Sequence, residues 1–297
     1  MNYAQLRAKI EGNSWQERLY SDKHDFQRER YLRLLDSHKL YFNNEEGLCV
    51  ISSPGRCEIV GNHTDHNNGF VLAAAVQLDI VAVLAKRQDK RVVLRSEGFP
   101  KIECDIADLS INPRQKGTSS ALIRGVASAM TDIGIELSGF EATVHSNVIS
   151  GSGVSSSAAF ELLICTAFDK LYNSSSLDAI TKAKISQYAE NVYFMKPSGL
   201  MDQLTASVGG LVLMDFDGDE PKVKPLDFSF FDKGYRLVLI NTGGSHGDLT
   251  DDYAAIRSEM QKTAKLICGK NVLRASDLAA LIKNAPRVRK EISERAF

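Results

Sequence analysis

The sequence contains no long hydrophobic run and no pattern typical of a secretory leader. None of its apolar stretches reaches the roughly 18 residues that suggest a membrane-spanning helix. The first residues, MNYAQLRAKIEGNSW, are polar and lack the apolar centre of a signal peptide. From these two absences we expect a protein that has no membrane partner and works in the cytoplasm.

Cysteine is scarce and the charges nearly cancel. The five cysteines are odd in number and form no CxxC pair, so neither a zinc site nor a disulfide framework is expected. We expect buried free thiols at Cys49, Cys57, Cys104, Cys165 and Cys268. The formal net charge of −1 argues against a nucleic-acid partner, because such proteins usually present a basic face.

What is present fits an ordinary globular protein. The 297 residues suffice for two modest domains or one large one, and 43% of them are apolar while 25% are charged. Residues 1 to about 45 have a helical pattern. The apolar and aromatic positions that recur at helical spacing are Tyr31, Leu34, Leu35, His38 and Phe42. The charged residues between them are Arg28, Arg30, Arg33 and Asp36. We predict an amphipathic surface helix packed on its own domain; a paired coil or a partner-binding helix is the alternative.

From Leu48 onward, short runs rich in Val, Ile and Leu predict strands. The predicted strands are 48–53, 57–60, 71–76, 79–87, 91–96, 141–148, 210–216 and 235–241. The predicted helices are 119–130, 154–172, about 177–194, and further helices from about 249. Because strands and helices are mixed without regular alternation, the fold class is α+β. A domain boundary is expected between residues 200 and 240.

The first unusual polar stretch is PGRCEIVGNHTDHNNG, from Pro54 to Gly69. Its sixteen residues hold one arginine, two histidines, three asparagines, one aspartate, one glutamate and three glycines. The chain then turns apolar at once, with VLAAAV. This concentration of hydrogen-bonding groups beside a buried strand suggests a site for a ligand rich in hydroxyls.

The second stretch is SGSGVSSSAAFELLICTAF, which begins at Ser150. Gly151 and Gly153 would let the backbone approach a ligand, and the following helix offers free N–H groups and the positive end of its dipole. This pattern favours a phosphate cradle, although it is not a P-loop, because no lysine follows. The alternative is a glycine turn with a serine N-cap. A cap requires one serine, whereas Ser155, Ser156 and Ser157 follow one another.

The third stretch is KPSGLMDQLTASVGG, which begins at Lys196. Asp202 is expected in a short segment between a helix and a strand, where its carboxylate could accept a proton or hold a metal. A turn or helix cap is the alternative. Taken together, the three stretches predict a phosphoryl-transfer site with a hydroxyl-binding part, a phosphate cradle and a carboxylate.

These stretches resemble a known family. PGRCEIVGNHTDHNNGFVL resembles the galactokinase signature, and GSGVSSSAA is similar to the ATP-binding motif of the GHMP small-molecule kinases. GLMDQ resembles the galactokinase segment that carries the catalytic aspartate, and NTGGSHGDLTDDYAAIR, from Asn241, resembles a later sugar-site segment. The resemblance covers about residue 45 to the C-terminus. It implies the GHMP kinase fold, with a helical extension over 1–45, an N-terminal domain over 46–210 and the start of a C-terminal domain over 211–297.

The resemblance also implies roles for individual residues. Asp202 corresponds to the catalytic carboxylate, and Arg56 would lower its pKa and stabilise the transferring phosphoryl group. The residues that would bind the sugar are Asn62, His63, Asp65, Gly199 and Tyr253. The residues that would wrap the ATP phosphates are Gly151, Ser152, Gly153, Val154, Ser155, Ser156 and Ser157. Ser157 and Glu190 would hold Mg²⁺. The implied reaction uses ATP to phosphorylate the anomeric C1 hydroxyl of galactose.

Three departures from the family pattern leave alternatives open. Asn62 stands where the family has glutamate, and His66 where it has tyrosine, so another hexose such as N-acetylgalactosamine is an alternative substrate. The third glycine-rich motif of the superfamily is absent from the chain, which ends RVRKEISERAF. A separate fragment that completes the fold, or an inactive truncated form, would each account for that absence. A sugar- and ATP-binding regulator without turnover is the remaining alternative, although such regulators lack the Ser157-Ala158 pair that is present here.

Overall fold

The structure is a computed structural model that describes residues 1–297 except 13–14, 21, 62–63, 150, 152 and 241–249. The side chains of 250–254 and 275 are also outside the description. In the described part, the strands form a seven-stranded sheet with the order β4-β3-β5-β2-β6-β7, and β1 pairs with β2 outside this path. The strands are β1 Cys49–Val60, β2 Phe70–Lys86, β3 Arg91–Ser96, β4 Ile102–Asp105, β5 Phe140–Ser146, β6 Leu211–Asp215 and β7 Lys222–Leu226. Among the strands of the described residues, only β3 and β5 pair in parallel.

Strand β2 organises this sheet. Along one edge it pairs with β1, and along the other it pairs with β6 at its start and with β5 at its end. The sequence predicts two strands at 71–76 and 79–87 and two more at 48–53 and 57–60. In the structure each pair is one continuous strand, and β1 runs through Pro54 with a register shift between Pro54 and Arg56.

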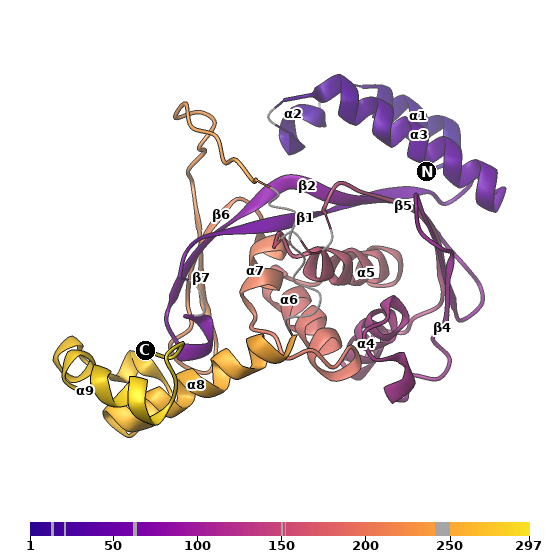
Figure 1. Cartoon of the computed structure of the whole chain (residues 1–297). Coiled ribbons are helices and arrows are strands. Elements are labelled where there is room, and N and C mark those ends of the chain that lie inside the picture. The colour runs from indigo at the N-terminus through magenta and orange to yellow at the C-terminus, as the bar shows by residue number, and fades with distance from the viewer. Residues whose placement is uncertain (13–14, 21, 62–63, 150, 152, 241–249) are drawn as a thin grey trace.

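Helices cover both faces of the sheet (Figure 1). One face carries α1 Tyr3–Glu11, α2 Gln16–Leu19 and α3 His24–Phe42. The other carries α4 Ser119–Asp132, α5 Ser156–Tyr172, α6 Ala179–Tyr188 and α7 Met201–Val208, with a π-helical turn at Ala189–Tyr193 after α6. The larger hydrophobic core lies between the sheet and α4 and α5, where the rings of Phe140 and Phe168 meet edge to face at 5.1 Å. A smaller core lies under α1 to α3.

Helix α3 confirms the prediction of a helix packed on its own domain, with one correction. Tyr31, Leu34, Leu35 and His38 are buried, as the spacing predicts. The spacing places Arg30 on the charged outer face, but its side chain is only 1% exposed. Its Nη1 lies 2.6 Å from Oδ1 of the buried Asp79 in β2. The sequence could not show this because the counter-charge is 49 residues away.

The last two helices, α8 Thr250–Cys268 and α9 Leu278–Glu291, lie beside the first polar stretch (Figure 1). The contact runs through η1, a short turn at Asp65–Asn67. The Nδ2 of Asn67 donates to Sδ of Met260 at 3.0 Å. Arg274, in the η4 turn Leu273–Ala275, donates to the carbonyl of Asn68 at 2.8 Å. The end of the polar stretch therefore holds the C-terminal helices.

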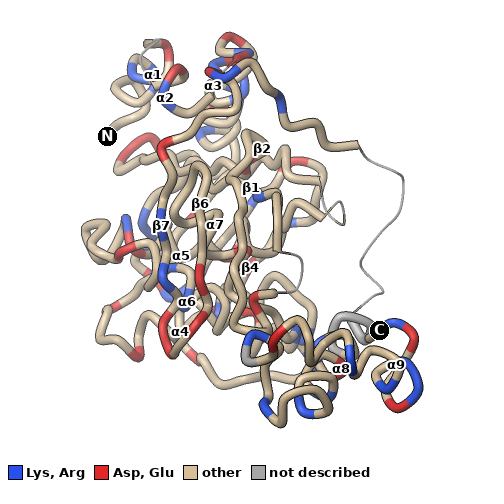
Figure 2. Tube along the Cα trace, turned by 90° about the vertical axis from the view of Figure 1, so that its left-hand side faces the viewer, with Lys and Arg blue, Asp and Glu red and all other residues tan. Residues whose placement is uncertain are grey.

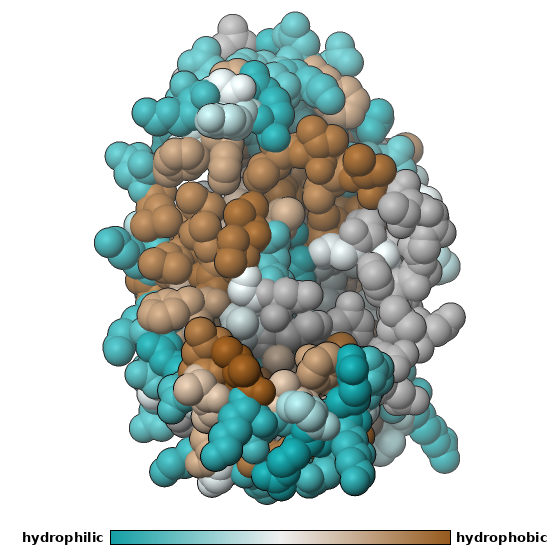
Figure 3. Space-filling model, turned by 60° about the vertical axis from the view of Figure 1, so that its left-hand side comes forward, coloured by the Kyte–Doolittle hydropathy of each residue, from teal (hydrophilic) through white to brown (hydrophobic). Residues whose placement is uncertain are grey.

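The predicted strand at 235–241 is wrong over its described part. Residues 235–240 have no regular structure, and Asn241 lies outside the described residues. Leu237 to Ile240 are exposed, Val238 at 76% and Ile240 at 81%. Figure 3 shows apolar side chains gathered around a hollow on this side of the molecule. The apolar run has strand character but no partner strand in the described chain, so it forms no hydrogen-bonded ladder.

Other expectations have mixed outcomes. All five cysteines are free, but only Cys104 and Cys165 are buried, whereas the other three are half-buried. Figure 2 shows basic and acidic residues interspersed along most elements. Among the described residues, no helix is both long and apolar enough to cross a bilayer.

The domain limits at 45 and 210 stay predictions.

Candidate active site

The first polar stretch approaches the glycine-rich stretch through Gly55 and Arg56. A Cβ added to Gly55 would lie 2.8 Å from the carbonyl oxygen of Val154, which is too close for any other residue. The backbone N–H of Arg56 donates to this same carbonyl at 3.1 Å. The glycine at position 55 therefore lets β1 hold the glycine-rich loop and places the Arg56 side chain beside it.

Arg56 and Asp202 form a two-point ion pair. Nε of Arg56 lies 2.7 Å from Oδ1 of Asp202, and Nη2 lies 2.6 Å from Oδ2. Ser155 donates its hydroxyl to Oδ2 of Asp202, and Nη1 of Arg56 donates to the carbonyl of Gly153 at 2.5 Å. The structure thus brings one residue from each of the three polar stretches to one point. Asp202 lies in the first turn of α7, a short helix between α6 with its π-helical turn and strand β6, which agrees with the predicted short segment between a helix and a strand.

The electrostatics of this pair keep both groups ionised. Burial raises the pKa of Asp202, but the charge of Arg56 and the hydrogen bonds from Arg56 and Ser155 outweigh burial, so its pKa lies below the ordinary value. For Arg56, burial lowers the pKa and the Asp202 carboxylate raises it, with a net rise. The side chains remain 14% and 28% exposed, so the pair is open to a ligand.

The glycine-rich loop leads into the N-terminus of α5. Gly151 and Gly153 have φ values of 73° and 78°, a left-handed conformation that favours glycine. Ser155 occupies the N-cap position, yet among the described side chains none caps the helix, because its hydroxyl points to Asp202. The structure therefore does not support the alternative of a glycine turn with a serine N-cap. The side chain of Val154 is buried in the main core, and its carbonyl accepts from Arg56; Ser152 lies outside the described residues.

The two residues expected to hold a metal lie together. The Ser157 hydroxyl donates to Oε1 of Glu190 at 3.0 Å, and Glu190 is only 2% exposed. Lys196 also contacts this oxygen at 3.1 Å. One hydroxyl and one carboxylate suit Mg²⁺, which usually takes one or two protein carboxylates and fills its octahedron with phosphate and water oxygens. No group of three His, Cys, Asp or Glu side chains in the described chain could hold a metal.

Glu161, in the apolar part of α5, is a site neighbour that sequence reasoning missed. The Nε2 of Gln203 bridges it to Glu190, at 3.0 Å from Oε2 of Glu161 and 2.9 Å from Oε2 of Glu190. Burial and the nearby Glu190 raise the pKa of Glu161 well above its ordinary value. A carboxyl one helical turn after Ser157, inside the run AAFELLICTAF, is the signal that could have identified it.

The expected sugar residues are only partly described. Gly199 lies against Asp65, because a Cβ at position 199 would lie 1.8 Å from Oδ2 of Asp65. The same Cβ would lie 3.2 Å from Cε1 of His66, one of the two residues that depart from the family signature. Asn62 and His63 lie outside the described residues. Tyr253 belongs to α8, but its side chain is not described.

Two family descriptions match the chain: the galactokinase galactose-binding signature over residues 36–86 and the GHMP kinases N terminal domain over residues 120–210. A galactokinase of Streptomyces coelicolor is 33% identical over 234 residues, which cover 77% of this chain and 59% of that protein. A galactokinase of Clostridium tetani is 31% identical over 220 residues, which cover 72% of this chain and 54% of that protein. The chain thus spans a little over half the length of these curated relatives.

Solved structures agree on the fold. The crystal structure of Lactococcus lactis galactokinase complexed with galactose aligns with a TM-score of 0.64 at 24% identity, over 77% of this chain and 59% of that one. Methanococcus jannaschii mevalonate kinase aligns with a TM-score of 0.52 at 17% identity, over 63% and 58%. These likenesses confirm the α+β fold of the GHMP kinases. Together with the two matching signatures and the galactokinase relatives, they show that the chain belongs to the galactokinase family of the GHMP kinases.

Proposed function

We propose that this chain carries the site of an ATP-dependent sugar kinase, which converts galactose and ATP into galactose 1-phosphate and ADP. The observation that carries the proposal is the contact of Asp202 with Arg56 and Ser155, because it joins the three polar stretches in one place. The galactose-binding signature and the galactokinase relatives support galactose as the sugar. A role in galactose metabolism in the cytoplasm follows from the same proposal.

In the proposed reaction the C1 hydroxyl oxygen of the sugar forms a bond to the γ-phosphorus of ATP. The bond from that phosphorus to the bridging oxygen breaks and ADP leaves, while the hydroxyl proton passes to the Asp202 carboxylate. Because Arg56 and Ser155 lower the pKa of Asp202 against the effect of burial, this carboxylate is a weak base. Orientation of the hydroxyl and the positive charge of Arg56 must therefore supply most of the rate.

The phosphates would lie on the N-terminus of α5, against the backbone of Gly151 to Ser157. The N–H groups of its first turn are not capped by any described side chain, so they are available to phosphate oxygens. Ser157 and Glu190 would hold Mg²⁺, which when bound draws charge from the phosphate oxygens. Lys196 lies 3.1 Å from Glu190 and adds positive charge at the same place.

The sugar would lie near Asp65 and Gly199, with Asn62, His63 and Tyr253 as further contacts. A carboxylate such as Asp65 can accept hydrogen bonds from two hydroxyls, which discriminates between epimers. Asn62 cannot supply the charge of the family's glutamate. Another hexose, such as N-acetylgalactosamine, is therefore the second substrate to test.

We also propose that a further polypeptide segment covers residues 235–240, either as a continuation of the chain or as a separate C-terminal fragment. Its support is the exposure of Leu237, Val238, Leu239 and Ile240, which are between 43% and 81% exposed. Large exposed apolar patches on soluble domains usually mark contact surfaces.

The test is ADP release with ATP and magnesium across a panel of hexoses, with Asp202→Asn as the matched variant. We expect galactose-dependent release that falls by at least about a hundredfold in Asp202→Asn, while sugar binding and the melting temperature change little. Normal turnover in the variant would refute the role of Asp202. Sugar binding without turnover in a cooperatively folded protein would favour the non-catalytic regulator. Release with a different hexose would keep the reaction and change the substrate, and Asn62→Glu should then shift the ranking of sugars.

A further inference from the structure

A cavity of about 420 Å³ lies on the side of the sheet that carries α3, between that helix, the turn after β3 and strand β5. None of the residues assigned to the kinase site lines it. The lining side chains that a ligand could contact include Arg33, Leu34, Tyr41, Glu97, Phe99 and His145. Its volume falls within the range typical of small-molecule sites.

The lining is positively charged. Three arginines face one acidic residue, Glu97, and Arg30 is already neutralised by Asp79 in β2. Arg95 lies over the ring of Tyr41 at 5.5 Å, and no carboxylate of the described chain forms an ion pair with it. The cavity therefore has more cationic than anionic groups at its surface.

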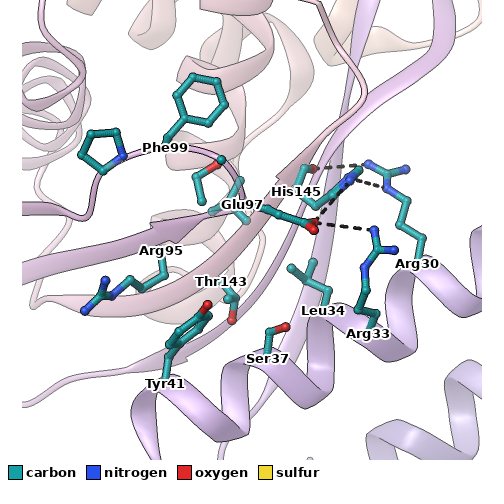
Figure 4. A pocket seen from close by; sticks show the side chains of 14 residues that line it. Arg30, Arg33, Leu34, Ser37, Tyr41, Arg95, Glu97, Phe99, Thr143 and His145 are labelled. Carbon is teal, nitrogen blue, oxygen red and sulfur yellow. Dashed lines mark hydrogen bonds and ion pairs between the residues drawn. The ribbon is translucent and has the colours of Figure 1, made fainter.

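The carboxylate of Glu97 occupies a position between Arg33 and His145 where an anion could bind (Figure 4). Its Oε2 lies 3.6 Å from Nη2 of Arg33 and 3.5 Å from Nε2 of His145. Both distances exceed those of ordinary charge-assisted hydrogen bonds. The side chains of Glu97 and Arg33 are each 59% exposed, and ion pairs this exposed contribute little to stability. The carboxylate is loosely held and can be exchanged.

His145 is preset to donate toward this position. Nε of Arg30 donates to Nδ1 of His145 at 2.9 Å, which leaves the proton of the neutral ring on Nε2, the atom that faces Glu97. Burial and the charge of Arg30 lower the pKa of His145, so the ring is neutral near pH 7. Arg33 and His145 thus offer one charged and one neutral donor from two different elements.

We propose that this cavity binds a small organic oxyanion, a phosphate or carboxylate group on a short apolar body, which replaces the Glu97 carboxylate between Arg33 and His145. The apolar body would contact Leu34, Tyr41 and Phe99. Arg95 also lines the cavity, and its positive charge would attract the anion from a longer distance. This inference does not depend on the kinase proposal, because it uses none of its residues.

The probes are phenyl phosphate and benzoate, with benzyl alcohol as the neutral match, titrated into the full chain by calorimetry. Each titration is done without ADP and again with saturating ADP, which blocks the proposed phosphate cradle. We expect both anions to bind and the alcohol not to bind. Equal binding of the alcohol, or loss of anion binding when ADP is added, would overturn the proposal.

Three variants test the direction in which the anion affinity should change. Glu97→Gln removes the internal competitor and should tighten anion binding several-fold, whereas Arg33→Gln should weaken it by about tenfold. Arg91→Gln is the matched control, because Arg91 lies on the same strand as Arg95 but does not line the cavity. All three positions are largely exposed at the surface, so the fold should survive. Weaker binding in Glu97→Gln, or equal losses in Arg33→Gln and Arg91→Gln, would refute the assignment.

Discussion

The buried ion pair between Arg30 and Asp79 gives the sharpest stability prediction. Asp79 accepts hydrogen bonds on Oδ1 from Arg30 at 2.6 Å and on Oδ2 from Tyr20 and Ser52, both at 2.5 Å. The side chains of the pair are 1% and 4% exposed. Asp79→Asn preserves the shape of the side chain but leaves the Arg30 guanidinium buried without its counter-charge.

Removing one partner of a buried pair typically costs about 3–5 kcal/mol, because the remaining charge stays desolvated. For a chain of this size, that corresponds to a fall in melting temperature of roughly 10 °C. The matched control is Asp89→Asn. It makes the same change in the ion pair of Asp89 with Arg87, in which the Asp89 side chain is 43% exposed. Exposed pairs contribute about 1 kcal/mol or less, so this control should unfold nearly as the wild type does.

Urea unfolding followed by circular dichroism measures both effects. A double variant, Arg30→Met with Asp79→Leu, tests the cause, because it removes both buried charges and should recover part of the lost stability, although the Tyr20 and Ser52 hydroxyls lose their acceptor. If Asp79→Asn costs less than about 1 kcal/mol, or if the double variant is less stable than the single one, the unpaired buried charge of Arg30 is not the cause of the lost stability.

Two further predictions concern a buried histidine and a glycine at the sugar site. Burial lowers the pKa of His38 from 6.5 to about 4, so the folded state resists protonation. The stability that depends on neutral His38 is complete above pH 6.5 and is lost as the pH falls toward 4, by about 3 kcal/mol in total. Urea titrations at several pH values should show a smaller acid loss in His38→Phe, and parallel losses in the two proteins would contradict the reasoning. Gly199→Ala places a Cβ 1.8 Å from Oδ2 of Asp65 and should lower galactose affinity by at least about tenfold in calorimetry. An unchanged affinity would separate Gly199 and Asp65 from the sugar.

The sequence predicted the local elements well where the pattern was strong. The helices at 119–130 and 154–172 are α4 and α5 to within two residues, and the strand at 91–96 is β3. It also predicted that Arg56, Asp202 and the serines share a site, because the three polar stretches have the order and spacing of a family. The roles of these residues in catalysis stay predictions.

What the sequence missed depends on contacts between distant residues. Arg30 reads as a surface residue because only the fold brings it to Asp79. Glu161 lies in an apolar run, and its link to Glu190 goes through Gln203, which is 42 residues away. Residues 235–240 have the composition of a strand, but composition cannot show whether a neighbouring strand exists. The short strands β4 and β7, IECD and KVKPL, are too polar to give a signal.

The continuity of β2 has a consequence for how the chain opens. This single strand of 17 residues forms ladder hydrogen bonds with β1, β5 and β6. The N-terminal helices pack on its second half, and Arg56 of the ion pair with Asp202 lies opposite Ala75 in its first half. Strand β1 pairs with both halves of β2, whereas β6 pairs with its start and β5 with its end, so amide hydrogen exchange along β2 should report one slow, cooperative unit. Helices α8 and α9 meet this unit through the η1 turn and Arg274, so their amides should exchange through a separate opening of lower free energy.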